Sequence, residues 1–212
     1  MLYEATGNPY YKHLAVSSLD RLYHECGLPD GLFTSAEWLK GRGIMHSHET
    51  CDAIDMCWTL GYFLEILQEA RYADMMEKIV FNAGMGSIAN DFKSLQYYSS
   101  VNQFICTGTS NHNKDNYCST WMAYRPTHQT ECCAGQIHRL MPNYAARMWL
   151  RSKDGVVAAL YGPSKFKYSD DVTLIQETSY PYNERVTIRV EAEKAKKFAL
   201  HLRIPTWCEG AT

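Results

Sequence analysis

The chain has 212 residues, of which 46% are hydrophobic and 21% charged, and its formal net charge is −2. That length is enough for one large domain with a real core. The nearly balanced charge provides no basic field for nucleic acid or an anionic membrane surface. No stretch approaches the roughly 18 consecutive apolar residues of a membrane span, and the first residues lack a signal-peptide pattern. We therefore expect a globular protein with no nucleic-acid or membrane partner, and the compartment stays open.

Helical patterns dominate the first part of the chain. Apolar residues recur near one face of residues 10–25, and Gly27 follows as a stop signal. Residues 51–70 are strongly apolar at near-helical spacing, and residues 71–87 continue as a second helix. The two segments together predict a helical hairpin.

The next predicted helix covers residues 132–150, with a kink or break at Pro142. Between this helix and the hairpin lies a long polar stretch, residues 106–130. A loop of that length inside a compact domain is usually functional. We expect it to pass over a site.

After residue 152 the pattern changes to short β-branched runs separated by turn residues. Helices followed by strands predict a mainly α part and then a separate β part. The expected division is residues 1–151 and residues 152–212. The predicted strands lie in residues 155–162, 172–180, 185–192 and 197–205.

Eight cysteines are spread over the chain with irregular spacing. This distribution favours free thiols or a metal site over a disulfide scaffold. They occupy positions 26, 51, 57, 106, 118, 132, 133 and 208.

Two short segments, HSHETCD (46–52) and ECC (131–133), could form a metal site. Zn²⁺ accepts thiolates and a carboxylate oxygen together. Residues two apart face opposite ways on a regular helix, so these ligands can converge only in a loop or at a helix start. Helix N-termini favour anions and would help to keep thiols deprotonated. The candidate ligands are Glu49, Cys51, Cys132 and Cys133.

Spacing alone leaves alternatives open for these residues. The segments match none of the common zinc-ribbon spacings, so buried inert thiols or a disulfide between Cys132 and Cys133 compete with a metal. Glu37 is either an exposed glutamate at a helix start or a general acid/base that faces the cysteines. Four nearby histidines are further candidates as ligands, substrate contacts or structural residues: His46, His48, His128 and His138.

Several stretches along nearly the whole chain resemble the β-L-arabinofuranosidase-like glycoside hydrolases, glycoside hydrolase family 127 and its relatives. They occur in the order of that family, and the ETC, CC and RIPxW motifs within them are the most specific. The stretches are GLFTSAEWLKG, HETC, RYADMMEKIVFNAG, ECCAGQIHRLMPNYAARMW, YPYNERVTIRV and FALHLRIPTWCEGA.

The resemblance implies an (α/α)6 toroid catalytic domain followed by a β-sandwich, and a retaining glycosidase that acts on β-linked L-arabinofuranose or a related furanoside. It implies zinc as the cofactor, with Cys132 as the nucleophile and Glu37 as the acid/base. The zinc ligands that it implies are Glu49, Cys51, Cys132 and Cys133.

The resemblance also implies that toroid helices before Met1 are missing, so that exposed apolar helix faces would favour association with a missing N-terminal part or another chain. Two other functions remain open from the residues. One is a non-catalytic, zinc-stabilised module that binds carbohydrate or a protein. The other is a redox protein that uses Cys132 and Cys133.

Overall fold

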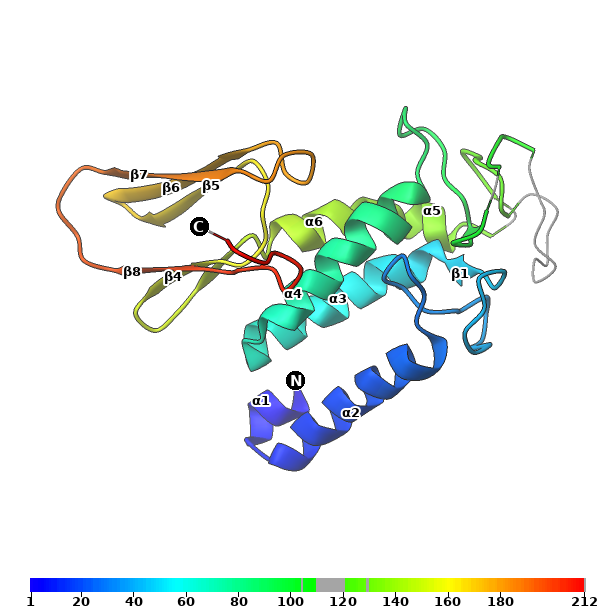
Figure 1. The fold of residues 1–212 in the computed structure, drawn as a ribbon, viewed down its shortest axis with the longest axis horizontal. Helices are drawn as coiled ribbons and strands as arrows, with labels where there is room; N and C mark the ends of the chain where they lie inside the picture. The colour runs from blue at the N-terminus through cyan, green and yellow to red at the C-terminus, as the bar shows by residue number, and fades with distance from the viewer. Residues whose placement is uncertain (104, 110–120, 129, 212) are drawn as a thin grey trace.

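The computed structural model describes residues 1–103, 105–109, 121–128 and 130–211. Helices come first along the chain, and two small sheets follow at the other end of the molecule (Figure 1). Among the described residues, no helix is long and apolar enough to cross a membrane. The helical part contains α1 (Leu2–Thr6), α2 (Pro9–Cys26), α3 (Thr50–Leu67), α4 (Ala70–Lys78), the π-helical turn η1 (Ile79–Gly84), α5 (Cys132–Gln136), the 3-10 turn η2 (Ile137–Arg139) and α6 (Leu140–Ala145).

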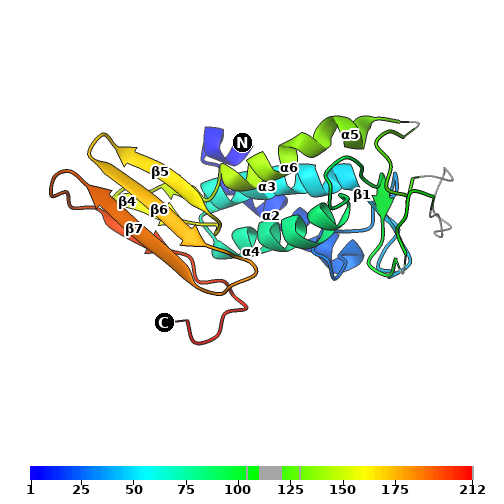
Figure 2. The ribbon, with the colours of Figure 1, turned by 90° about the horizontal axis from the view of Figure 1, so that it is seen from above.

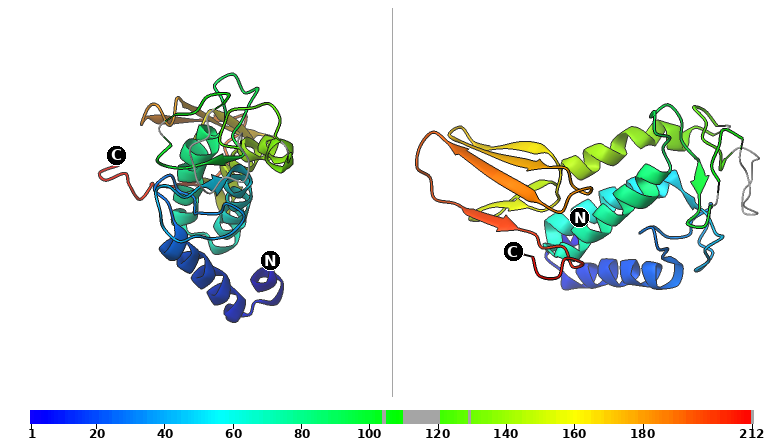
Figure 3. Two further views of the ribbon diagram at one scale, coloured as in Figure 1. Left: turned by 90° about the vertical axis from the view of Figure 1, so that its right-hand side faces the viewer. Right: turned by 45° about the horizontal axis from the view of Figure 1, so that its top comes forward.

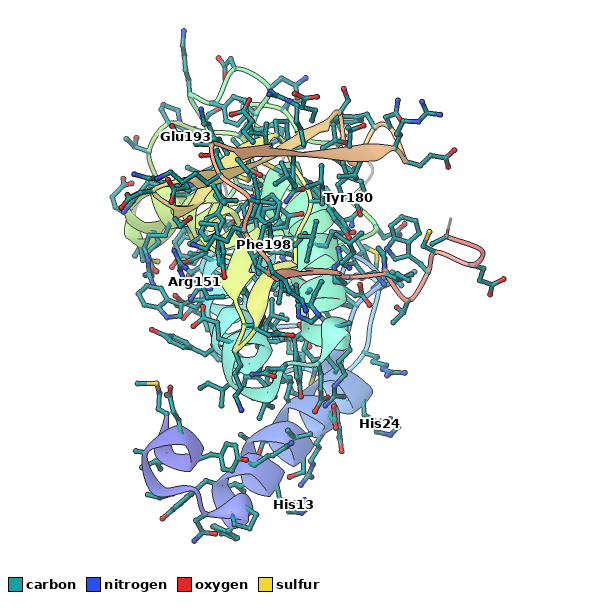
Figure 4. The ribbon with its side chains drawn as sticks, turned by 90° about the vertical axis from the view of Figure 1, so that its left-hand side faces the viewer. His13, His24, Arg151, Tyr180, Glu193 and Phe198 are labelled. Carbon is teal, nitrogen blue, oxygen red and sulfur yellow. The ribbon has the colours of Figure 1, made fainter. Side chains whose placement is uncertain are left out.

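Helix α2 confirms the prediction for residues 10–25. The side chain of Asn8 accepts a hydrogen bond from the backbone N–H of Tyr10, and Pro9 occupies the first turn, where its missing N–H costs nothing. Leu19 is buried against the core, but Leu14 is 48% exposed. Helices α1 and α2 lie along one side of the molecule, and His13 and His24 mark the course of α2 (Figures 3 and 4).

The predicted hairpin is formed by α3 and α4, which are joined at Gln68 and Glu69. Gln68 ends α3 in the left-handed conformation. The second helix is regular only as far as Lys78 and continues as the π-helical turn η1. Fully buried side chains from these elements and from α6 form the centre of the main core, and they include Ile54, Leu60, Tyr72, Met76, Ile79 and Tyr144.

The prediction of a helix over residues 132–150 with a kink or break at Pro142 differs from the structure in two respects. The interruption lies at η2, before Pro142. Pro142 itself is the third residue of α6, a position at which a backbone N–H has no partner within a regular helix, so its missing N–H is tolerated there. The helix also ends at Ala145, and Trp149 begins a strand. Strand pairing with residues 156–158 overrides the helical pattern there.

The last part of the chain forms two three-stranded sheets (Figures 1 and 2). One has the order β3-β4-β8, with β4 and β8 parallel, and the other is the antiparallel meander β5-β6-β7. The four predicted strands are confirmed as β4, β6, β7 and β8, whereas β3 and β5 were not predicted. The strands are β3 (Trp149–Arg151), β4 (Gly155–Ala158), β5 (Ser164–Ser169), β6 (Val172–Thr178), β7 (Val186–Ala192) and β8 (Ala199–Leu202).

A buried ion cluster joins the strand region to α4. The guanidinium of Arg203, just after β8, donates to the carboxylates of Asp74 and Glu77 and to the carbonyl of Ala159. The hydroxyl of Tyr180 also donates to Glu77. Because these partners come from the helical and the strand regions, the cluster fastens the two parts of the chain to each other.

A further two-stranded ladder lies at the opposite end of the helices (Figure 1). Strand β1 (His48–Glu49) pairs antiparallel with β2 (Tyr98–Ser99), so that His48 lies opposite Ser99 and Glu49 opposite Tyr98. The chain passes directly from β1 into α3. This ladder therefore fixes the start of the helix on which two of the predicted metal ligands lie.

Candidate functional site

The four predicted metal ligands come together at the end of the helical part that lies farthest from the two sheets (Figure 1). Glu49 is the N-cap of α3 and Cys51 lies in its first turn, while Cys132 and Cys133 begin α5. Two helix starts thus supply all four side chains. This is the irregular backbone that the spacing of the two segments required.

One donor atom from each of the four residues lies within 4.8 Å of the other three. Cys51 Sγ is 3.2 Å from Cys133 Sγ. The carboxylate oxygen Oε1 of Glu49 is 3.3 Å from Cys132 Sγ and 3.4 Å from Cys133 Sγ. Donor atoms of a tetrahedral zinc ion are roughly 3.5 to 3.8 Å apart, because Zn–S bonds are about 2.3 Å long and Zn–O bonds about 2.0 Å. The donor set fits such an ion.

Free thiols are found at Cys26, Cys51, Cys57, Cys132, Cys133 and Cys208, and Cys118 lies outside the described residues. Burial raises the pKa of Cys132 to about 11, and the neighbouring Cys51 and Glu49 add to the effect. The hydrogen bond with Cys51, together with burial, also raises the pKa of Cys133. Thiolates at these positions therefore require a positive charge nearby, which a divalent cation supplies.

Tyr97 is a site residue that the sequence did not reveal. Its hydroxyl lies 2.8 Å from Cys132 Sγ, and its ring stacks on Trp121 with the ring centroids 4.3 Å apart. Burial raises the pKa of the Tyr97 hydroxyl, so it stays protonated and can donate a hydrogen bond to sulfur. Only the number of tyrosines hinted at such a role, and nothing in the sequence distinguished this one.

Glu37 lies in a loop and not at a helix start. The loop is closed by Thr34, whose hydroxyl donates to the carbonyl of Gly41 at 2.9 Å and accepts from the N–H of Lys40 at 3.3 Å. Glu37 is exposed and has a φ of 68°, which is the left-handed region that non-glycine residues rarely occupy. Its Oε1 atom accepts a hydrogen bond of 2.6 Å from the hydroxyl of the buried Tyr98.

Tyr97 and Tyr98 link the two predicted catalytic residues. One tyrosine hydroxyl contacts Cys132 and the next contacts Glu37, and the two rings meet edge to face with centroids 5.0 Å apart. Backbone hydrogen bonds from both tyrosines to the carbonyl of Trp121 hold this segment in place. Residues 121–128 belong to the long polar stretch that was expected over a site, but residues 110–120 and 129 of it lie outside the described residues.

The four candidate histidines are not part of the metal-ligand group found among the described residues. His48 is buried and bound to Asp30, and Nε2 of His128 donates to the carbonyl of Leu95 at 2.9 Å. His46 faces the carbonyl of Gly41. His138 lies in η2.

Ser35 and Asp52 complete the surroundings of Glu49, and sequence reasoning missed both. The Ser35 hydroxyl accepts a hydrogen bond from the backbone N–H of Glu49 at 3.4 Å. Burial raises the pKa of Asp52 to about 6, although a hydrogen bond with Ser35 opposes the change and the charge of Glu49 adds to it. Ser35 thus connects the backbone of Glu49 to the carboxylate of Asp52 at the start of α3.

Comparison with protein families gives two matches that together cover most of the chain. A model of the β-L-arabinofuranosidase GH127 catalytic domain matches residues 31–146. A model of the GH127 middle domain matches residues 155–212. The catalytic-domain match contains the four clustered residues and Glu37.

Individual relatives agree with these matches. A curated non-reducing end β-L-arabinofuranosidase of Bifidobacterium longum subsp. longum is 25% identical over 175 residues, which are 77% of this chain and 25% of that protein. The crystal structure of a GH127 β-L-arabinofuranosidase from Geobacillus stearothermophilus T6 superposes with a TM-score of 0.79 at 22% identity, over 99% of this chain and 34% of the other.

A second solved structure, of a GH127 β-arabinofuranosidase, has a TM-score of 0.73 at 20% identity and covers 97% of this chain and 31% of that one. The two structures show that the fold is shared. The chain spans between a quarter and about a third of the length of these relatives.

Proposed function

The chain belongs to the β-L-arabinofuranosidase family GH127, and we propose that it carries the metal-dependent active site of a retaining glycosidase for β-linked L-arabinofuranosides or related furanosides. The observation that carries the proposal is the convergence of one carboxylate and three thiols within 4.8 Å. In this proposal the four residues hold a zinc ion. Bound zinc would lower the pKa of the thiols and fix the position of the nucleophilic sulfur.

Cys132 is the proposed nucleophile, in the place of the carboxylate that most retaining glycosidases use. Its sulfur attacks the anomeric carbon of the furanoside, and the bond from that carbon to the glycosidic oxygen breaks. Glu37 donates its proton to the departing oxygen. The products of this first step are the free alcohol and a sugar joined to Cys132 through a C–S bond.

Water then completes the reaction on the same face of the sugar. The Glu37 carboxylate takes a proton from water, the water oxygen attacks the anomeric carbon, and the C–S bond breaks to restore the Cys132 thiolate. Two successive inversions give net retention of configuration. Tyr97 supports both steps, because a hydrogen bond from its hydroxyl stabilises the thiolate as nucleophile and as leaving group.

The family resemblance extends the proposal to architecture. We infer that residues 1–151 are part of an (α/α) toroid and that residues 152–212 begin a β-sandwich. The two three-stranded sheets and the exposed apolar side chains on the helices, Leu14 and Trp58 among them, support this interpretation. The proposed partner is a carbohydrate that contains arabinofuranose.

The catalytic assignment is tested by hydrolysis of an aryl β-L-arabinofuranoside. We expect Cys132→Ala and Glu37→Gln each to reduce the rate by about 100-fold or more, because each removes a group that takes part in bond making or proton transfer. Cys208→Ala and Glu25→Gln are matched controls outside the site, and we expect them to change little. Unchanged hydrolysis in both site variants would contradict the assignment.

Metal analysis provides a second test of the same site. We expect about one zinc ion per chain, and loss of that zinc in Cys133→Ala. Because the chain spans only part of the relatives' length, the same substitutions belong in a full-length relative as well. If this chain binds zinc and carbohydrate, and the site variants of the full-length relative still hydrolyse the substrate, the chain is instead a zinc-stabilised binding module.

A further inference from the structure

We propose that the buried pair of Asp30 and His48 is a positioning device that aims the carboxylate of Glu49 at the metal. The inference rests on the proposed zinc site and adds two residues that supply no ligand atom to it. Its basis is the short hydrogen bond between the pair, the position of His48 next to Glu49 in β1, and the rigid turn that holds Asp30.

Both ring nitrogens of His48 have partners inside the protein. Nε2 donates to Asp30 Oδ2 at 2.6 Å, and the hydroxyl of Ser99 lies 3.4 Å from Nδ1. The His48 side chain is only 2% exposed. A histidine in this state has no nitrogen left for a metal or a sugar hydroxyl, so its role is to hold the backbone of β1.

Because His48 and Glu49 are neighbours in β1, holding His48 in place also sets the position of Glu49. Successive side chains of a strand point to opposite faces, so fixing His48 on one face sets the direction of Glu49 on the other. Strand β1 has only two residues and one partner strand. Beyond that ladder, the backbone N–H of Glu49 donates to the hydroxyl of Ser35 at 3.4 Å, a longer bond than the one between His48 and Asp30.

Asp30 is itself well fixed, as an anchor must be. Its Oδ1 atom accepts a hydrogen bond from the N–H of Leu32 at 3.2 Å, within the turn that follows α2. Gly31 has a φ of 97°, and a Cβ at this residue would lie 3.0 Å from the backbone nitrogen of Ile79. The turn is therefore packed against the end of α4, and the hydrogen bond to His48 ties β1 to the main helical body.

The expected consequence is a metal site that weakens when the anchor is removed. Partners of this kind, one layer outside the ligands, typically contribute about 10- to 100-fold in metal affinity. We expect His48→Ala and Asp30→Ala each to weaken zinc binding by about that factor, as measured by competition with a chromophoric chelator. His46→Ala is the matched control, because His46 lies two residues before His48 and its Nδ1 faces the carbonyl of Gly41 at 3.4 Å.

Two further measurements separate positioning from general damage to the fold. If both residues act through one hydrogen bond, the double variant loses no more affinity than either single variant. With Co²⁺ in place of zinc, the visible spectrum of His48→Ala should shift towards that of Glu49→Gln, because the carboxylate no longer reaches the ion. His48→Gln keeps an N–H donor and should recover part of the affinity.

Zinc affinity that is unchanged in Asp30→Ala and His48→Ala would overturn the proposal, as would a lower affinity with an unshifted cobalt spectrum. Should His48→Ala fail to fold, Asp30→Asn and His48→Gln decide the question by the same measurements. If the unsubstituted chain binds no zinc, the proposed zinc site is wrong and the inference falls with it. Absence of zinc binding by the unsubstituted chain is a different result from unchanged zinc affinity in the variants, so failure of the zinc site and failure of the positioning role are distinguishable.

Discussion

Two adjacent tyrosines connect the residues proposed to carry out the reaction. Tyr98 is fully buried, and its hydroxyl donates to Glu37 at 2.6 Å. Glu37 holds a left-handed backbone conformation, which costs a non-glycine residue about 1–2 kcal/mol. Such a conformation persists only where the surroundings impose it. Tyr98 and the closed loop around Thr34 are the groups that impose it here.

Removing the Tyr98 hydroxyl tests whether it positions the acid. A hydrogen bond to a charged group contributes about 1.5–3 kcal/mol, so we expect Tyr98→Phe to slow hydrolysis of an alkyl arabinofuranoside about tenfold or more. A dinitrophenyl arabinofuranoside, whose leaving group needs no protonation, should lose far less. Tyr124→Phe is the control, since the Tyr124 hydroxyl donates to the carbonyl of Gly86 and Glu37 accepts from Tyr98 instead. Equal losses on both substrates would show that Tyr98 is merely structural.

At the scale of elements, helix α3 organises both the core and the site. Its first turn carries Glu49 as N-cap and Cys51, while its middle packs against α4, η1 and α6. Buried apolar side chains of α3 point to several sides of the helix, a pattern that is typical of a helix packed on more than one face. Helix α2 differs, because its apolar face is only partly covered in this chain.

Matched leucine truncations in α3 and α2 measure this difference. Leu60 is fully buried, and we expect Leu60→Ala to lower the free energy of unfolding by about 2–5 kcal/mol through lost burial and a residual cavity. Leu14 is half exposed, and Leu14→Ala should change the same quantity by less than about 0.5 kcal/mol. Urea denaturation followed by circular dichroism gives both values. A large loss at Leu14 would mean that its side chain is covered in solution.

For the whole molecule, the ion cluster around Arg203 decides whether the strand region stays fastened to the helices. The Arg203 side chain is 3% exposed, and its carboxylate partners on α4 are also buried or nearly so. Further hydrogen bonds satisfy the cluster: Arg203 donates to the carbonyl of Ala159 at 2.6 Å, and the hydroxyl of Tyr180 donates to Glu77. Removing one partner of a buried ion pair strongly lowers the free energy of unfolding, because the remaining charge stays buried without its counter-charge.

We therefore expect Arg203→Ala to lower the free energy of unfolding by about 3–5 kcal/mol, because it leaves Asp74 and Glu77 buried without their counter-charge. Arg189→Ala, which breaks exposed ion pairs with Glu177 and Glu191, should lower the free energy of unfolding far less. Thermal unfolding of the two variants compares them directly. Similar losses at the two arginines would show that the Arg203 cluster contributes no more than a surface pair.

Much of the fold could be predicted from sequence because the signals are local. The helix at residues 10–25 and the strands at 172–180 and 185–192 follow from periodicity and turn residues close in the chain, and the structure confirms them. Strand β5 was missed although Phe166 and Tyr168 alternate with lysines there, since the run is short and mostly polar. Strand β3 reads as helix until its pairing with β4 is known.

The residue types and the two short segments of the site are determined by the sequence alone. Spacing left a zinc site as one alternative among several, and family motifs selected Glu49, Cys51, Cys132 and Cys133. Only the tertiary structure decided that their donor atoms meet, that Tyr97 and Tyr98 contact the proposed catalytic residues, and that His48 is anchored on Asp30. The physical reason is distance along the chain, because contacts between residues 18 to 84 positions apart leave no periodic trace in the sequence.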